Sequence, residues 1–118
     1  MSLHLALLKV PVTDLATSVP FYAALLGQEA DFVAEEYGWA QFGAPAPGLA
    51  LYVPGKGGGD RASGGSLDFH LSAPDLDGVR NRIAALVTAQ IHENADGTRS
   101  LECEDPSGNG LKIMEGPA

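Results

Sequence analysis

The stretch LLKVPVTDLATSVPFYAALLG, from Leu7 to Gly27, carries the pattern that decides the fold. Its first residues alternate apolar side chains with polar or constrained ones, which predicts a β-strand. Asp14 follows as a helix N-cap, because its carboxylate can accept hydrogen bonds from free backbone N–H groups. Apolar residues then recur at helical spacing as far as Leu26, and Gly27 ends the helix. Pro20 costs a backbone hydrogen bond inside a helix, so we expect an irregular first turn.

The same pattern returns in the second half of the chain, in FHLSAPDLDGVRNRIAALVTAQ, residues 69–90. A shift of 61 residues lays Asp14 on Asp75 and superimposes the apolar positions of the two helices. Order, spacing and element type agree, so we interpret the chain as an internal duplication rather than a chance coincidence of common residue pairs. The apolar stripe expected on the second helix consists of Leu76, Val79, Ile83, Leu86 and Val87.

Each helix is followed by segments that alternate as strands do. They lie at 29–36, 38–44 and 48–55 in the first half, and at 91–95, 99–105 and 110–115 in the second. Each half is therefore predicted to be a βαβββ module of a single domain, with module one at 1–54 and module two at 66–118. The joining segment, 55–65, is almost entirely Gly, Ser and charged residues, so nothing in it can pack and we expect a mobile linker.

The composition excludes several classes of function. The chain has 118 residues, a net charge of -8 and seven basic residues, which argues against nucleic acid or an anionic membrane surface as a partner. Cys103 is the only cysteine, so an internal disulfide and a thiolate metal site are both excluded. No apolar run is long enough to span a bilayer, and no signal-peptide pattern is present. We therefore expect a cytoplasmic protein.

The two βαβββ modules, the residues DLATSVPFYAALLG after the first strand and the turn EDPSGNGLKI before the last strand together resemble the vicinal oxygen chelate superfamily. This is the group of glyoxalase I, bleomycin-resistance proteins and extradiol dioxygenases. The resemblance covers essentially the whole chain. It implies an α+β fold whose modules form an open, eight-stranded, barrel-like sheet around a cavity, with the helices outside. It also implies a homodimer.

The enzymes of that superfamily hold a divalent metal that chelates two substrate oxygens and stabilises an enediolate-like charge. The resemblance implies one ligand on the first and one on the last strand of each module, normally His, Glu or Gln. Counted from the Asp-Leu and Asp-Pro motifs, these four positions hold Leu7, Ala50, Asp68 and Lys112. Only Asp68 can bind a metal, so we expect no metal and no cofactor. We expect Lys112 to pair with Asp68, because burying either charge alone is costly.

Period-two alternation predicts which other side chains face the cavity. Lys112 and Met114 alternate with the core residues Leu111 and Ile113, and Lys9 is expected to share this inner surface. His70 is open to four interpretations: a metal ligand, a base, a ligand-binding group, or a structural histidine with both ring nitrogens satisfied. The candidate ligand-binding residues are Trp39, Gln41, Tyr52, Asp68, His70, Glu102, Lys112 and Met114.

Three of the remaining residues have a structural interpretation beside the functional one. Trp39 is either a stacking wall for a flat ligand or a packing contact, and Tyr52 is a similar case. Glu102 is either a general base or a counter-charge for a lysine. His92 is expected to be solvated, and Cys103 to be a buried core thiol without a nucleophilic role.

Three functions fit this pattern. The first is a metal-free protein that sequesters a small organic molecule, as bleomycin-resistance proteins do, with the acidic charge favouring a cationic or neutral ligand. The second is a metal-dependent lyase, isomerase or dioxygenase of the glyoxalase type with atypical ligands. The third is a non-catalytic partner or regulatory domain whose cavity is filled by side chains. We expect the first, with no catalytic residue.

Overall fold

Two βαβββ modules make up the fold, as the duplication predicts. A computed structural model of the chain describes residues 5–43, 47–64 and 69–116. Module one contains strand β1 (Leu7–Pro11), helix α1 (Leu15–Leu26), strand β2 (Phe32–Ala34), the 3-10 helix η1 (Glu35–Tyr37), and strands β3 (Trp39–Phe42) and β4 (Gly48–Tyr52). Module two contains strand β5 (His70–Ala73), helix α2 (Leu76–Ile83), and strands β6 (Gln90–Glu93), β7 (Arg99–Glu104) and β8 (Gly110–Glu115).

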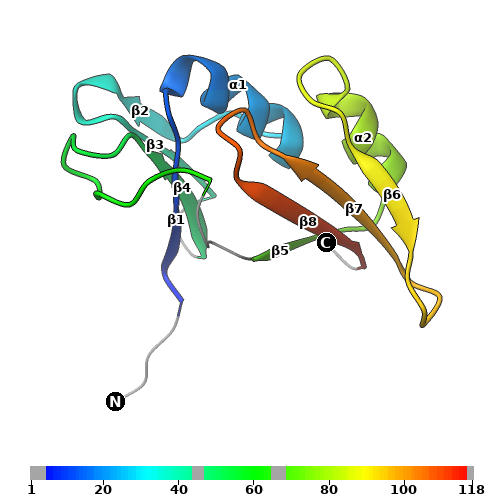
Figure 1. The fold of residues 1–118 in the computed structure, drawn as a ribbon. Coiled ribbons are helices and arrows are strands. Elements are labelled where there is room, and N and C mark those ends of the chain that lie inside the picture. Colours follow the sequence, from blue (N-terminus) through cyan, green and yellow to red (C-terminus); the bar gives the residue numbers. More distant parts are fainter. Residues whose placement is uncertain (1–4, 44–46, 65–68, 117–118) are drawn as a thin grey trace.

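Each module has its own four-stranded mixed sheet. The strand orders are β1-β4-β3-β2 and β5-β8-β7-β6. Strand β1 runs parallel to its neighbour β4, and β5 runs parallel to β8. The described strands form no closed barrel. Figure 1 shows α1 and α2 next to each other on the same side of the two sheets. The predicted α+β fold of two modules with helices outside is confirmed.

A single hydrophobic core lies between the helices and both sheets. Phe21 and Tyr22 of α1 are fully buried and meet edge to face, with ring centroids 5.1 Å apart. Burying an apolar side chain of this size contributes roughly 1.5–3 kcal/mol. The same core includes residues of both modules: Val10, Phe42, Leu51, Leu76, Ile83, Leu101 and Ile113. The two modules therefore share one hydrophobic core.

Both helices begin where the sequence predicts, and α1 also ends there. Asp14 accepts a hydrogen bond from the backbone N–H of Thr17 at 2.8 Å, and Asp75 accepts one from Gly78 at 3.0 Å. Both aspartates are therefore N-caps. The hydrogen bonds from the backbone N–H and the hydroxyl of Thr17 hold the pKa of the Asp14 carboxyl below its usual value. Gly27 ends α1 with φ of 70°, a left-handed conformation that favours glycine.

Two local expectations about the helices are wrong. The helix α1 is regular from Leu15 onward, because Pro20 lies in its second turn and removes only one hydrogen bond, to the carbonyl of residue 16. The helix α2 ends at Ile83, where the carbonyl accepts from the N–H groups of Leu86 and Val87. This turn takes Leu86 off the buried stripe and leaves it 48% exposed. Neither helix in the described part of the chain is long and apolar enough to cross a membrane.

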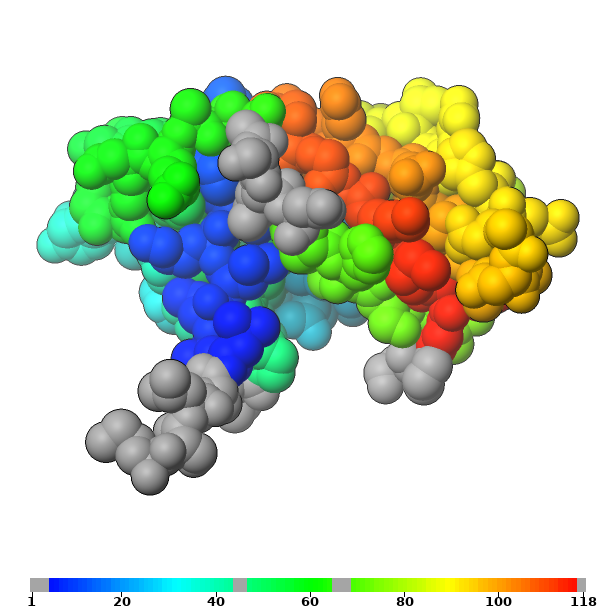
Figure 2. Space-filling model, turned by 60° about the horizontal axis from the view of Figure 1, so that its bottom comes forward, coloured from blue at the N-terminus to red at the C-terminus, as the bar shows by residue number. Residues whose placement is uncertain are grey.

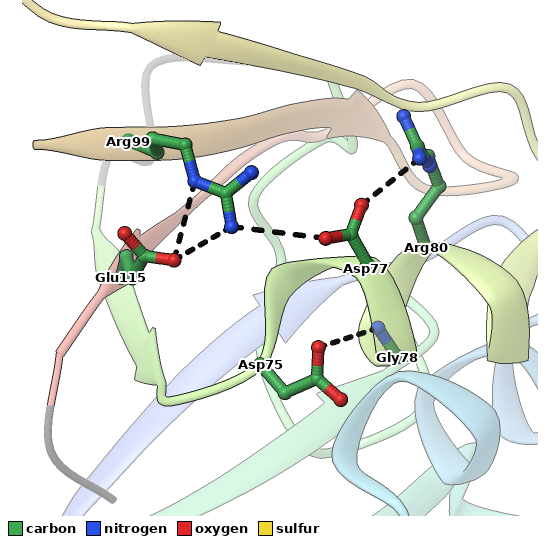
Figure 3. Close-up of polar contacts among 6 residues, drawn as sticks. All are labelled: Asp75, Asp77, Gly78, Arg80, Arg99 and Glu115. Atoms are coloured by element: carbon green, nitrogen blue, oxygen red, sulfur yellow. Dashed lines mark hydrogen bonds and ion pairs between the residues drawn. The ribbon is translucent and has the colours of Figure 1, made fainter.

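Ion pairs at the surface connect α2 to the second sheet (Figure 3). The Arg99 guanidinium on β7 lies 2.7 Å from Glu115 Oε2 on β8 and 3.7 Å from Asp77 Oδ2 on α2. Asp77 also contacts Arg80 at 3.0 Å. The hydrogen bonds from Arg99 hold the pKa of the Glu115 carboxyl below its usual value. Because these groups face solvent, we expect little stabilisation from each pair.

A buried polar cluster joins the Asp-Pro turn of module two to module one. Asp105 is only 4% exposed, and its carboxylate accepts from the Tyr22 hydroxyl at 2.7 Å. It also accepts from the backbone N–H groups of Ser107 and Asn109, both at 2.9 Å, and from the Asn109 amide at 2.8 Å. That amide donates as well to the carbonyl of Pro11 at the end of β1, at 2.7 Å. Burial and the Asp105 charge raise the pKa of Tyr22.

Candidate functional site

Each sheet has a face turned away from the helices, which we call its cavity face. In module one, the strand ladders align Lys9, Ala50 and Gln41 in one row of this face. Trp39 and Tyr52 stand in the next row, paired directly with each other. The indole N–H of Trp39 donates to Gln41 Oε1 at 3.3 Å. The predicted alternation of β3 is confirmed, since Trp39 and Gln41 share one face while the other two residues of β3 are buried in the core.

The segment 53–64, which we call the strap, lies over the cavity face of module one. A hydrogen bond from the N–H of Val53 to the carbonyl of Gly38 at 2.8 Å holds its start. Near its end, the N–H of Gly64 donates to Asn109 Oδ1, also at 2.8 Å. In Figure 2 these residues, drawn in green, form part of the surface near β1. Tyr52 is consequently only 2% exposed.

The prediction that nothing in this linker can pack is wrong, although its mobility stays a prediction. A Cβ atom at Gly58 would lie 2.8 Å from Trp39 Cε3, and one at Gly59 would lie 2.7 Å from Tyr52 Cε2. Both distances are shorter than any normal carbon contact, so the backbone itself rests on the two rings. The glycines that suggested only flexibility also permit this close approach.

Module two presents a polar row at the equivalent positions. Lys112 on β8 is paired with His70 on β5 and with Glu102 on β7. The prediction that Glu102 faces the same way as Lys112 is thus confirmed. His70 and Glu102 are exposed and Lys112 is half-buried, while Met114 lies in the next row and is also half-buried. Figure 2 shows β8, in red, accessible on the side opposite the helices.

Glu102 does not form the expected ion pair with a lysine. Glu102 Oε2 lies 3.1 Å from His92 Nε2, so this carboxylate contacts a histidine rather than a lysine. Within residues 5–43, 47–64 and 69–116, no carboxylate lies within ion-pair distance of Lys112. Asp68 lies outside the described residues, so its pairing with Lys112 stays a prediction.

The comparisons with known proteins agree with this architecture. A scan against protein-family models and a search of curated proteins each gave no match. Among solved structures, a glyoxalase/bleomycin resistance protein from Catenulispora acidiphila matches with 24% identity and a TM-score of 0.72, over 94% of this chain and 96% of that one. A lactoylglutathione lyase from Agrobacterium tumefaciens matches with 21% identity and a TM-score of 0.73, over 96% and 93% of the two chains.

A third structure, from Sphaerobacter thermophilus, is described as a member of the glyoxalase/bleomycin resistance protein/dioxygenase superfamily. It matches with 21% identity and a TM-score of 0.73, over 96% of this chain and 97% of that one. This chain has the vicinal oxygen chelate fold. Identities this low establish the fold alone, so the chemistry has to be argued from the residues of this chain.

Three of the four metal positions that the resemblance implies hold no suitable donor here, and the fourth, Asp68, lies outside the described residues. Leu7 and Ala50 are aliphatic, and Ala50 is fully buried in β4. Lys112 would place an ammonium beside the cation. In the part of the chain that the structure describes, no group of three or more His, Cys, Asp or Glu side chains is arranged to hold a metal ion. The described residues therefore do not fit the divalent metal of this superfamily.

The surroundings of Cys103 do not activate its thiol. Its side chain is half-buried and packs against the core rather than being fully enclosed as predicted. Burial, with a contribution from the Asp105 carboxylate, raises the pKa of the thiol to about 11. A thiol with this pKa is almost entirely protonated at neutral pH, and the thiolate is the reactive form.

An apolar cavity that the sequence did not predict lies on the helix side, between the two modules. Its volume is about 340 Å³, within the usual range of small-molecule sites. His70 at the start of β5 also lines this cavity, so it borders both the cavity face and the apolar space. The apolar lining includes Leu8, Leu26, Phe42, Leu49, Phe69 and Leu71.

Proposed function

We propose that this protein binds a small organic molecule on its cavity faces without a metal, in the manner that the resemblance to bleomycin-resistance proteins implies. One observation carries the proposal: the metal positions of the fold hold Leu7, Ala50 and Lys112 in the described residues. Two aliphatic groups and an ammonium do not coordinate a divalent cation, whereas they suit the walls of an organic ligand site.

The two faces supply complementary contacts for such a ligand. Module two offers hydrogen-bonding groups in the row of His70, Lys112 and Glu102, with Met114 beside them. Module one offers the aromatic pair formed by Trp39 and Tyr52, together with Gln41. The net charge of -8 favours a cationic or neutral ligand through its long-range field.

We also propose that the protein is a cytoplasmic homodimer. The resemblance supports dimerisation, and so do exposed apolar side chains at the edge of module one. Phe32 and Val33 of the edge strand β2 are 51% and 43% exposed, and Tyr37 of η1 is 60% exposed. An uncovered edge strand with apolar side chains is normally protected by a partner. Light scattering at micromolar concentration tests this, and a monomer alone would contradict it.

Two measurements test the binding function. The first is the metal content of the purified protein after dialysis, because a stoichiometric divalent metal would overturn the proposal and favour a glyoxalase-type enzyme. The second is a thermal-shift screen of organic molecules, since a ligand that binds only the native state raises the melting temperature. A screen without any hit would favour a cavity filled by side chains.

Variants at the polar row show whether a hit binds where we propose. Lys112→Met should weaken a hit that uses the cavity face of module two by about tenfold, the usual loss for one hydrogen bond to a charged group. Arg80→Met removes one positive charge from the exposed surface of α2 and serves as the matched control. Equal loss in both variants would point to a non-specific effect of charge.

A further inference from the structure

The strap contacts module one in a way that resembles a bound ligand. The backbone at Gly58 and Gly59 rests on the rings of Trp39 and Tyr52, at distances that leave no room for a Cβ atom. A peptide group is flat and polar at one edge, so it presents to these rings the shape of a small planar molecule. Two aromatic side chains from adjacent strands form the platform on which it lies.

Lys9 completes this contact. Its ammonium donates a hydrogen bond to the carbonyl oxygen of Gly58 and lies 5.2 Å from the centroid of the Tyr52 ring. No carboxylate of the described chain lies within ion-pair distance of Lys9. The partner of this ammonium is therefore a neutral carbonyl that the strap brings to it.

Apart from the Lys56 side chain, which lies beside Gly38, little else holds the middle of the strap in place. The N–H of Gly55 donates to the carbonyl of Gly59 at 3.0 Å, which closes a turn within the strap itself. Gly55 and Gly57 have φ of 86° and 115°, and neither would bring a Cβ near any other atom. Residues 55–61 contain no apolar side chain. The contact thus buries little apolar area on the strap side, and a larger ring would gain more from the same platform.

We propose that Lys9, Trp39 and Tyr52 form a binding subsite that the strap occupies as an internal substitute for ligand. The ligand class is a flat, neutral molecule with a carbonyl group. Its ring replaces the glycine backbone on the two aromatic side chains, and its carbonyl oxygen replaces that of Gly58 on Lys9. A neutral ligand suits the acidic chain better than an anion does. The inference rests on the proposed function, because it names one part of the proposed ligand site.

Displacement of the strap can be measured through Trp39, which is the only tryptophan of the chain. Gly58→Ala places a Cβ against the indole and should push the strap off the rings. We expect acrylamide to quench the fluorescence of this variant about twofold more strongly than that of the wild type, because quenching reports exposure of the indole. Ala62→Ser, at an exposed position of the same strap, is the control and should leave quenching unchanged.

Lys9→Met gives an independent way to release the strap. It removes the hydrogen bond to Gly58 without adding an atom near the rings, so it should also increase quenching of Trp39. Circular dichroism of each variant confirms that it is folded before quenching is interpreted. Should Gly58→Ala fail to fold, the comparison of Lys9→Met with Ala62→Ser still tests the strap.

The probe for binding is 2-quinolone, with naphthalene as a ring of similar size that lacks the carbonyl. Binding is followed by the indole N–H resonance of Trp39 in a nitrogen-15 correlation spectrum. We expect 2-quinolone to bind Gly58→Ala about tenfold more tightly than the wild type, since the internal competitor is gone. Adding Lys9→Met to Gly58→Ala should weaken 2-quinolone about tenfold and leave naphthalene unchanged.

Unchanged quenching in both Gly58→Ala and Lys9→Met would overturn the proposal. Equal affinity of 2-quinolone for wild type and Gly58→Ala would overturn it as well, because no competition would exist. These outcomes differ from a failure of the proposed function. A bound metal or a metal-dependent activity would contradict that function, but it would not alter the quenching comparison.

Discussion

The two modules share one scaffold and carry different cavity faces. The ladders place Lys9 of module one where module two has His70, and Tyr52 where it has Met114. The face of module one is aromatic and covered by the strap, whereas that of module two is polar and open. The difference teaches that a duplicated backbone fixes which positions face the cavity, while the side chains at those positions decide what they can bind.

The contacts between the modules are equally asymmetric. Tyr22 of α1 donates to the buried Asp105 of module two, but its counterpart in the repeat is Ile83, which has no polar group to offer. On the outer side of the helices, Arg82 of α2 donates to the carbonyls of Ala24 and Leu25 in α1. Each module therefore contributes a different kind of contact to the shared core.

The buried cluster around Asp105 gives the largest predicted effect. Asp105→Ala leaves the Tyr22 hydroxyl and the Asn109 amide without their buried acceptor, and it removes the two backbone bonds that shape the turn. We expect a loss of more than about 3 kcal/mol in the free energy of unfolding, because unsatisfied buried donors each cost 1–3 kcal/mol. Urea denaturation followed by circular dichroism measures it.

The matched change to the hydrogen bond between Tyr22 and Asp105 is Tyr22→Phe. It removes a single hydrogen bond and leaves the other donors of Asp105 in place, so we expect a loss of about 1–2 kcal/mol. If the two variants were equally stable, the Asn109 and backbone contacts of Asp105 would contribute nothing beyond its bond with the Tyr22 hydroxyl.

The row of His70, Lys112 and Glu102 predicts that module two can be converted into a metal site by one change. Lys112→His replaces the ammonium with an imidazole between two potential ligands on neighbouring strands. Zinc at a hundredfold excess over its dissociation constant should then stabilise the fold by about 2.7 kcal/mol. Thermal unfolding with and without zinc measures the shift.

The control for this site is Lys112→His combined with His70→Asn, which removes one of the three ligands. It should bind zinc much more weakly than Lys112→His alone. Equal zinc binding by both variants would mean that the three side chains do not converge, and the proposed geometry of the polar face would be wrong.

The predicted pair of Lys112 and Asp68 can be tested by a double-mutant cycle with Lys112→Met and Asp68→Leu. A fully buried pair would lose about 3–5 kcal/mol when one partner is removed. Because Lys112 is half-buried, we expect a coupling below about 1 kcal/mol. The matched cycle with Glu102→Gln should show no coupling, since Glu102 contacts His92. Strictly additive effects in the first cycle would refute the pair.

Cys103 gives the smallest effect, in reactivity rather than stability. Burial raises the pKa of its thiol from 9.0 to about 11, so the thiolate fraction at pH 8 is about a hundredfold lower than in the unfolded chain. Alkylation by iodoacetamide should be slower by about that factor and should accelerate as the pH approaches 11. The same chain in urea is the control, and equal rates in both states would show an accessible, unperturbed thiol.

Local patterns in the sequence were sufficient for the order of the elements and the direction of their side chains. Asp14 and Asp75 cap the helices because a carboxylate satisfies backbone N–H groups only a few residues away. The predicted alternation of Leu111, Lys112 and Ile113 is present in β8, because successive side chains of a strand point to opposite faces. These effects act over short distances along the chain, so the sequence alone determined them.

Only the tertiary structure decided which distant segments meet. The turn at Asp105 was predicted from its residues, but its burial depends on Tyr22, which lies 83 positions earlier. The glycines of the strap permit a close approach of the backbone to other groups, but only the folded structure shows that Gly58 and Gly59 lie against the rings of Trp39 and Tyr52. Such contacts depend on how the two modules and the strap fold against one another, and no local pattern contains that information.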